Sequence, residues 1–206
     1  PLCTFLSGGL DSSVITAVAA RDYQRRGLPA LETYSFDYTY NAKYFTPSSF
    51  QPDADQPWVE RMTEAFHTRH TVLTCPIPDL CALLDDAVAA KDLPGMADVD
   101  SSLLYFCRRV AERHVVALSG ECADEVFGGY PWYHREEILF EDTFPWSRSV
   151  GLRLGLLAPD VVRDGWAFVR EHYLSTCRRA EKLPSDSKKD ARMREMFVLN
   201  LDWFMA

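Results

Sequence analysis

The sequence predicts an α/β fold in which a parallel sheet has helices on both faces. Short apolar runs alternate with segments whose apolar residues recur at helical spacing. Two of these runs end at junctions rich in serine and glycine, which are typical of a strand turning into a helix. The 206 residues, 47% hydrophobic and 25% charged, are enough for one sizeable core. No internal repeat accompanies this alternation.

The predicted elements alternate along the first two thirds of the chain. Residues 2–6 form the first strand, and apolar side chains recur at helical spacing between residues 10 and 27. Further strands are predicted at residues 31–36, 71–73 and 115–118, the last as a buried strand. Further helices are predicted at residues 57–66, 77–90 and 101–113, and residues 37–56 as a long loop.

The last third of the chain has a different pattern. From residue 130 onward the periodicity is helical, and we expect a helical extension over residues 131–206 that follows a core at residues 1–130. A polar, basic stretch at residues 178–194 includes Lys182, Lys188 and Lys189. We interpret it as a solvated loop and not as a binding patch.

Composition excludes several classes of protein. No apolar run approaches the roughly 18 residues that span a bilayer, and the first residues lack the basic region of a signal peptide. The six cysteines form no C-x-x-C pair, which favours reduced thiols in a cytoplasmic protein. The net charge of −8 disfavours nucleic-acid and anionic-membrane partners. Both ends of the chain fall at predicted elements, so we expect a segment of a longer protein.

The first strand-to-helix junction, residues 6–13, has the composition of a phosphate site. Gly8 and Gly9 allow the backbone to approach an anion closely. The amides of Ser12 and Ser13 are predicted at a helix N-terminus, where the helix dipole favours negative charge. Asp11 would repel a phosphate unless a cation joined it, which indicates Mg²⁺. The competing interpretation is a helix-capping turn in which Asp11 is a cap.

The second junction, residues 119–130, reads S-G-E-C-A-D-E-V-F-G-G-Y. In open parallel sheets, ligands bind at the carboxyl ends of the strands, so the two junctions are expected to face one crevice. Glu121 and Asp124 lie three residues apart, and we expect them on one face of the turn, opposite Asp11, as ligands or near neighbours of Mg²⁺. The alternative is an acidic pair that favours the dipole at a helix start.

These two strings carry a resemblance to a known family that covers nearly the whole chain. S-G-G-L-D-S-S resembles the pyrophosphate-binding loop (PP-loop) of ATP pyrophosphatases, and the second string resembles the asparagine synthetase motif S-G-E-G-[SA]-D-E-x-F-G-G-Y. Cys122 departs from that motif, since glycine is usual there. A cysteine must either adopt the glycine conformation or accompany a different turn.

The resemblance implies roles for individual residues. Adenosine contacts are implied for Leu6, Phe36, Ser119 and Gly120. Phosphate contacts are implied for Ser7, Gly8, Gly9, Asp11, Ser12 and Ser13. Asp11 and Asp124 would hold the metal, and Glu121, Asp124 and Asp202 would act at the reaction centre, with Asp202 supported only by residues 199–205.

The resemblance also implies an activity. ATP would activate the side-chain carboxylate of aspartate as an acyl-adenylate, and ammonia would then release AMP. In the intact protein, ammonia would come from glutamine through an N-terminal glutaminase domain, and the protein would be a homodimer. Neither that domain nor the family's phosphate-contacting lysine falls within these 206 residues, so we expect low activity from this segment alone.

Two other functions fit the same residues. A β-lactam synthetase or another amide-forming, adenylating enzyme would use the same scaffold without ammonia. The residues that follow Asp124 favour the asparagine synthetase motif. A nucleotide-binding module without catalysis is the second alternative, and the presence of Asp11, Glu121 and Asp124 argues against it.

Overall fold

The computed structural model divides the chain into two compact units, residues 1–121 and residues 122–206. It describes residues 2–47, 53–93, 95–160 and 163–204. The division falls after Glu121, before the predicted boundary at residue 130. Each unit is described by itself below.

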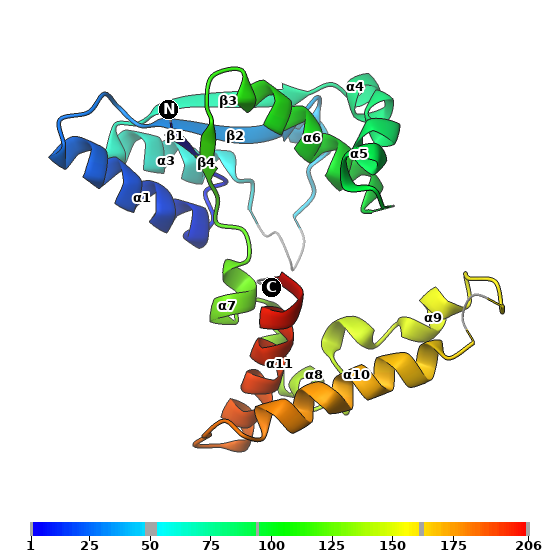
Figure 1. Cartoon of the computed structure of the whole chain (residues 1–206). Coiled ribbons are helices and arrows are strands. Elements are labelled where there is room, and N and C mark those ends of the chain that lie inside the picture. Colours follow the sequence, from blue (N-terminus) through cyan, green and yellow to red (C-terminus); the bar gives the residue numbers. More distant parts are fainter. Residues whose placement is uncertain (1, 48–52, 94, 161–162, 205–206) are drawn as a thin grey trace. The chain divides into compact units, whose positions relative to one another are not determined.

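A four-stranded parallel sheet forms the centre of the first unit (Figure 1). Its strands lie in the order β3-β2-β1-β4, and β1 pairs with both β2 and β4. Their bounds are β1 Leu2–Phe5, β2 Glu32–Tyr38, β3 Arg69–Cys75 and β4 Val116–Leu118. All four predicted strands are therefore present.

Helices cover both faces of this sheet, which confirms the predicted fold class. The helices α1 and α3 lie along one face, and α6 lies across the other together with α4 and α5 (Figure 1). Their bounds are α1 Leu10–Arg25, α2 Asn41–Tyr44, α3 Gln56–Phe66, α4 Ile77–Ala82, α5 Leu84–Lys91 and α6 Ala97–Ala111. The short α2 lies within the predicted loop at residues 37–56, of which residues 48–52 are outside the described part.

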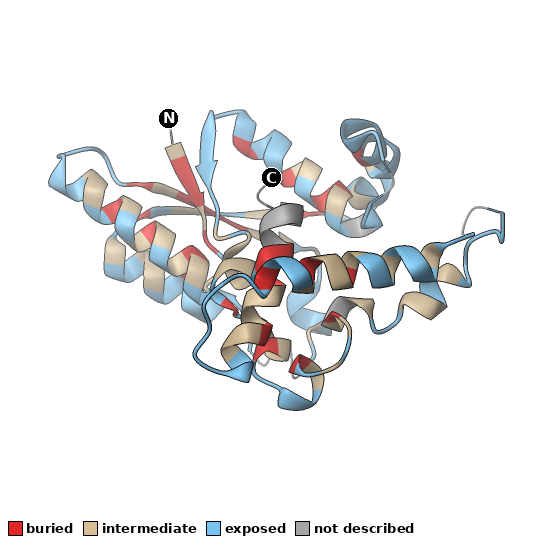
Figure 2. Cartoon of the chain, turned by 60° about the horizontal axis from the view of Figure 1, so that its bottom comes forward, coloured by how far each residue is buried: buried red, intermediate tan, exposed pale blue. Residues whose placement is uncertain are grey.

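Two predicted elements differ from the structure. The single helix expected at residues 77–90 is two helices, because the chain leaves helical geometry at Leu83. The strand expected to be buried is exposed throughout, as Figure 2 shows for β4, with Val116 48% accessible. The prediction of burial is wrong because β4 pairs on one side only and forms an edge of the sheet.

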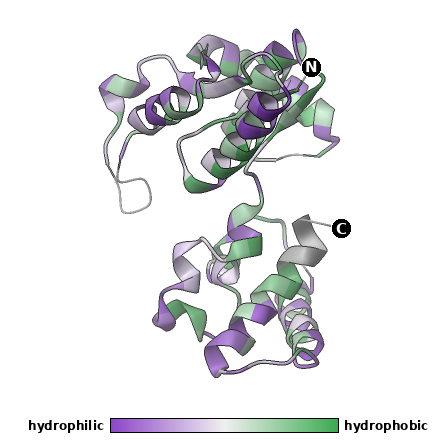
Figure 3. Cartoon of the chain, turned by 90° about the vertical axis from the view of Figure 1, so that its left-hand side faces the viewer, coloured by the Kyte–Doolittle hydropathy of each residue, from purple (hydrophilic) through white to green (hydrophobic). Residues whose placement is uncertain are grey.

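The two layers of the first unit differ in chemistry. Against α6 the sheet is apolar, and the Phe36 ring stacks on Phe106 at 4.2 Å between centroids. Against α1 it presents hydroxyl groups, since Thr4 lies within 2.9 Å of the Thr16 hydroxyl on α1. Figure 3 shows hydrophilic and hydrophobic stretches side by side along the helices. The apolar residues Leu10 and Val18 of α1 are exposed, so the helix buries its small and hydroxyl-bearing side.

His70, whose ring contacts hydroxyl groups of β2, is expected to make the free energy of unfolding depend on pH. Its Nδ1 lies 2.9 Å from the Thr33 hydroxyl and its Nε2 lies 3.0 Å from the Ser35 hydroxyl. Burial lowers the pKa of His70 below its ordinary value of 6.5. The unfolded chain therefore takes up a proton first, and stability that is complete above pH 6.5 is lost as the pH falls toward the folded pKa.

We expect the free energy of unfolding, measured in urea, to fall between about pH 7.5 and pH 5, less steeply in His70→Gln than in the wild type. Glutamine retains hydrogen-bonding groups but does not titrate. Equal slopes in the two proteins would contradict the assignment to His70.

The second unit is helical around a core of its own. Tyr133, Leu139, Phe144, Tyr173 and Met196 are buried together in it. Its α-helices are α7 Ala123–Phe127, α8 Glu136–Leu139, α9 Val150–Leu154, α10 Gly165–Ala180 and α11 Lys188–Phe204. Two short 3-10 helices, Pro131–Tyr133 and Pro145–Ser147, separate α7, α8 and α9. The predicted helical extension is confirmed for the described residues.

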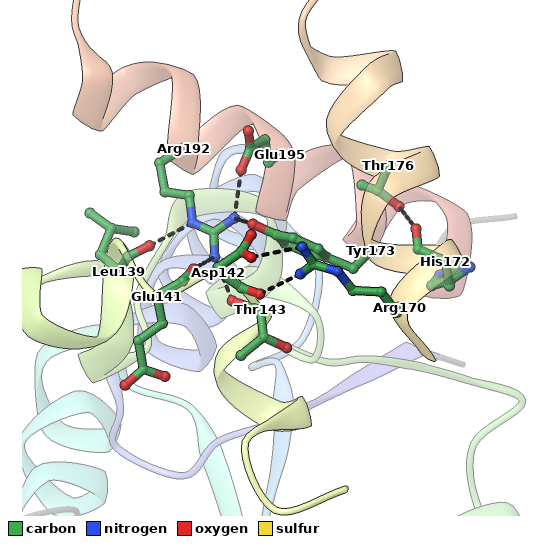
Figure 4. Close-up of polar contacts among 10 residues, drawn as sticks. All are labelled: Leu139, Glu141, Asp142, Thr143, Arg170, His172, Tyr173, Thr176, Arg192 and Glu195. Carbon is green, nitrogen blue, oxygen red and sulfur yellow. Dashed lines mark hydrogen bonds and ion pairs between the residues drawn. The ribbon is translucent and has the colours of Figure 1, made fainter. Parts of the chain in front are cut away.

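The prediction of a solvated loop at residues 178–194 holds for residues 181–187, which are an exposed loop, but it fails at Arg192. Most of that stretch is helical, and Arg192 on α11 is only 6% exposed. Figure 4 shows how its guanidinium ties α11 to the segment that follows α8. It donates hydrogen bonds to the carbonyl oxygens of Leu139, Glu141 and Thr143, to the Tyr173 hydroxyl and to the Glu195 carboxylate. A buried charge is stable here because polar groups satisfy it.

Two further features concern the cysteines and the length of the helices. All six cysteines are free, and Cys3 and Cys75 are buried. Among the described residues, no helix combines the length and the apolar character that crossing a membrane requires.

Candidate active site

The two predicted junctions follow neighbouring strands. The strands β2 and β3 follow β1 on one side of it in the sheet. The next strand in the chain, β4, instead pairs with β1 on its other side. The strand order therefore reverses between β1 and β4. In open parallel sheets, ligands bind at the carboxyl ends of the strands at such a switch point. Both junctions lie at the carboxyl ends of these two strands.

The hydroxyl of Ser12 organises the first junction. It accepts a hydrogen bond from the Ser7 amide at 3.2 Å, lies 3.0 Å from the Ser7 hydroxyl, and donates to the Gly9 carbonyl oxygen at 3.2 Å. Ser12 is 8% exposed, so its side chain is committed to shaping the loop. A ligand would meet its amide, not its hydroxyl.

The helix start provides amides for an anion. A helix leaves its first amides without an intrahelical partner, and here these include the amides of Leu10, Asp11 and Ser12. The Ser13 amide already donates to the Gly9 carbonyl oxygen at 3.1 Å. The prediction that the Ser13 amide contributes to a phosphate cradle is therefore wrong, because this amide lies inside the helical network.

Gly8 in the first junction lies against the start of α3, a contact that the sequence pattern did not indicate. Its φ is 81°, and a Cβ added there would lie 2.7 Å from Trp58 Cβ and 3.0 Å from the Asp55 carbonyl oxygen. The loop thus packs against the start of α3. No local signal in the sequence linked Trp58 to Gly8.

Gly120 joins the two junctions. A Cβ added at this position would lie 2.7 Å from the Ser12 amide nitrogen and 3.0 Å from Asp11 Cβ. The loop after β4 therefore rests directly on the first turn of α1. The expected proximity of the junctions is confirmed for Gly120, Asp11 and Ser12. Glu121 follows, exposed, and its amide donates to the Ser119 hydroxyl at 3.2 Å.

Two of the expected adenosine contacts are largely part of the core. Leu6 is 1% exposed, and its amide donates to the Tyr34 carbonyl oxygen at 2.8 Å. The Phe36 ring packs between Phe5 and Phe106. A nucleotide at these positions would meet mainly the strand backbone, whereas Ser119 is exposed.

Cys122 adopts the conformation for which glycine is usual. Its φ of 67° and ψ of 4° lie in the left-handed region, immediately before α7. Glu121 precedes this change of direction and Asp124 follows it. The expectation that Glu121 and Asp124 lie on one face of the turn stays a prediction, and a left-handed residue lies between the two positions.

Because a side chain is strained in that conformation, we expect Cys122→Gly to raise the free energy of unfolding by about 0.5–1 kcal/mol. The midpoint of urea unfolding would report the change. The same substitution at Cys81, an exposed residue inside α4, should instead destabilise the protein by about 0.5 kcal/mol. A lower midpoint for Cys122→Gly would contradict the strain.

Asp124 lies in the second unit, at the start of α7. Its carbonyl oxygen accepts hydrogen bonds from the amides of Gly128 and Gly129 at 3.0 and 3.1 Å. A Cβ at Gly129 would clash with the Asp124 carboxylate in its present position, so a larger residue there would displace that side chain. Asp202 lies on α11, and its side chain is outside the described residues.

The predicted metal ligands are two carboxylates, those of Asp11 and Asp124. Within the described residues, no group of three or more His, Cys, Asp or Glu side chains could hold a metal. Mg²⁺ needs less from a protein, because one or two carboxylates suffice when substrate phosphates complete its shell. Asp11 supplies one such carboxylate beside the free amides of α1, and Asp124 belongs to the other unit.

The sheet order, the switch point and the serine- and glycine-containing loop at the start of α1 define an α/β domain of the PP-loop class. Comparison with known proteins identifies the family. The family model for asparagine synthase matches residues 1–206, and the chain belongs to this family.

Curated relatives agree with this assignment. Over 212 residues the chain is 50% identical to asparagine synthetase (glutamine-hydrolyzing) 3 of Bacillus subtilis strain 168, a match that covers 100% of the chain and 33% of the relative. It is 30% identical over 142 residues to asparagine synthetase (glutamine-hydrolyzing) 1 of the same organism, covering 65% of the chain and 19% of the relative. An asparagine synthetase of Asparagus officinalis is 28% identical over 138 residues, which cover 66% of the chain and 22% of that relative. The chain thus spans a third or less of the length of these relatives.

Proposed function

We propose that this chain is the nucleotide-binding part of an enzyme that forms asparagine from aspartate, ATP and ammonia. One observation carries the proposal: Gly120 places the loop after β4 on the first turn of α1, at the switch point of the sheet. ATP bound there would have its phosphates at the free amides of α1 and its nucleoside toward the end of β4.

The reaction needs two transfers. A carboxylate does not react with ammonia, so an oxygen of the aspartate β-carboxylate attacks the α-phosphorus of ATP, and the bond to the bridging oxygen breaks to release pyrophosphate. Ammonia then attacks the acyl carbon of β-aspartyl-AMP, loses a proton and expels AMP. The protein holds the two anions in line and supplies positive potential.

The chain offers groups for both demands. The amides of Asp11 and Ser12, with Ser7, Gly8 and Gly9, would bind the pyrophosphate portion. Ser13 would contribute only its side chain. Asp11 and Asp124 would hold Mg²⁺, which when bound neutralises phosphate charge. Glu121 and Asp202 remain proposed for the reaction centre, and Leu6, Phe36, Ser119 and Gly120 for the adenosine.

The source of ammonia is proposed from the relatives. Those named above are glutamine-hydrolyzing enzymes by name. We propose that glutamine is also the source of ammonia for the intact protein that contains this chain. We further propose that the intact protein is cytoplasmic and homodimeric.

The proposal is tested by product analysis of the intact protein. Aspartate, ATP, Mg²⁺ and ammonium are supplied, and asparagine, AMP and pyrophosphate are measured in parallel. We expect the three products in equal amounts. ADP and phosphate in place of AMP and pyrophosphate would exclude attack at the α-phosphorus. AMP without asparagine would favour another acceptor, such as the substrate of an amide-forming cyclase.

A further inference from the structure

A buried pair of hydroxyl groups connects β1 to α1 behind the phosphate loop. The Thr4 and Thr16 hydroxyls are 2.9 Å apart, and either can be the donor. Both residues are fully buried, with 0% exposure. Thr4 precedes the loop on β1, and Thr16 lies one helical turn beyond Ser12 on α1. The pair therefore spans the loop from both ends.

The packing of α1 gives this pair an unusual importance. Large side chains that interdigitate normally fix the rotation and the axial position of a helix. The buried face of α1 instead consists of Ser12, Thr16 and Ala20. The larger residues Leu10 and Val18 are 78% and 65% exposed. A face of small side chains allows close approach to the sheet, but it does not define the position of the helix along it.

Directional hydrogen bonds can supply that definition. The bond between Thr4 and Thr16 sets one point of contact, and the bond between Ser7 and Ser12 sets a second point one turn nearer the helix start. Together they fix where the first-turn amides of α1 lie relative to the end of β1.

We infer that Thr4 and Thr16 are positioning residues for the pyrophosphate portion of the nucleotide. They do not touch the ligand. They hold α1 in the register that aims the amides of Asp11 and Ser12 at the phosphates. The inference rests on the proposed function for the identity of the ligand.

The double variant Thr4→Val/Thr16→Val separates positioning from stability. Each single change leaves one buried hydroxyl without its partner and lowers the melting temperature. The double change replaces both hydroxyls by methyl groups of similar shape, so the melting temperature should return to within about 4 °C of the wild type. Because displacements of about 1 Å cost up to about 100-fold in a positioned site, we expect about 10-fold weaker nucleotide binding by this well-folded double variant.

Binding is measured by titration calorimetry on the intact protein with Mg²⁺ and an ATP analogue that carries a methylene bridge between the α and β phosphorus atoms. Thr16→Ser retains the hydroxyl and should bind within about 2-fold of the wild type, whereas Thr16→Val should not. Thr68→Val is the matched control. It removes a buried hydroxyl that bonds to Thr33 at 3.3 Å, on the loop between α3 and β3. This loop follows Phe66, which contacts Gln24 in the last turn of α1 and not the first turn that carries the phosphate loop.

The outcomes decide between the explanations. Wild-type affinity in the double variant, or equal affinities in Thr16→Ser and Thr16→Val, would overturn the inference and leave the pair a structural contact. Equal losses in Thr68→Val and the double variant would overturn it as well. The analogue does not react, so binding tests the pair even if asparagine is not the product, and the product analysis above tests the proposed function separately.

Discussion

Replacing Gly120 by alanine is expected to reduce kcat/KM for ATP by about 100-fold while the protein remains folded. The added Cβ would lie 2.7 Å from the Ser12 amide nitrogen and 3.0 Å from the Asp11 carbonyl carbon and Cβ. These are backbone atoms and the root of a side chain, so neither can rotate away. The loop after β4 must therefore move off the first turn of α1, where the nucleotide is proposed to bind.

Steady-state kinetics and a thermal melt would be recorded on the same preparations of the intact protein. Gly155→Ala is the matched control, because its φ of −67° suits any residue and its added Cβ meets only carbonyl oxygens at 3.4 Å. It should retain wild-type kcat/KM. If Gly120→Ala also retained it, the contact between the two junctions would have no role in binding ATP.

The order of elements and the two junctions could be predicted from the sequence because both depend on local patterns. A run of three to six residues was enough to indicate each strand. Ser7 to Gly9 and Ser119 to Gly120 are recognisable where two of these strands end. The parallel order followed from the alternation of strands and helices.

The properties that depend on distant residues could not be predicted in this way. The burial of β4 depends on its position at the edge of the sheet, which its own residues do not encode. The buried side of α1 consists of small and hydroxyl-bearing residues and includes Thr16, whose hydroxyl lies 2.9 Å from that of Thr4, a contact that the apolar spacing of the helix did not indicate. Arg192 is buried because three carbonyl oxygens from residues 139–143 surround it.

The site shows the same division. The glycine at position 120 is part of a motif, yet its contact with Ser12 joins segments that are far apart in the chain. Local pattern also placed Glu121 and Asp124 on one face of the turn, but it did not indicate the left-handed backbone of Cys122 between them. The motif thus indicated which residues follow the two strands, but it did not indicate the backbone conformation of the segment that carries them.

Replacing Asp11 by asparagine is expected to lower kcat/KM for ATP by about 100- to 1000-fold and to raise the Mg²⁺ concentration required for half-maximal activity. Asp11 is the acidic residue in the first turn of α1, beside amides that favour phosphate. A carboxylate in that position repels the phosphates unless Mg²⁺ lies between them, so its charge would favour ATP binding only as a metal ligand. Asparagine retains the shape and loses the charge.

The effect on stability should be small, because loss of one negative charge at a helix start costs about 0.3–1 kcal/mol. Asp79→Asn provides the matched control, since Asp79 is also an acidic residue in the first turn of a helix, α4, outside the site. Both variants should lose similar stability in urea, whereas only Asp11→Asn should change the dependence on Mg²⁺. If the Mg²⁺ titrations of Asp11→Asn and the wild type coincided, Asp11 would be a helix-start residue and not a metal ligand, and the proposed metal site would have to be assigned to other carboxylates.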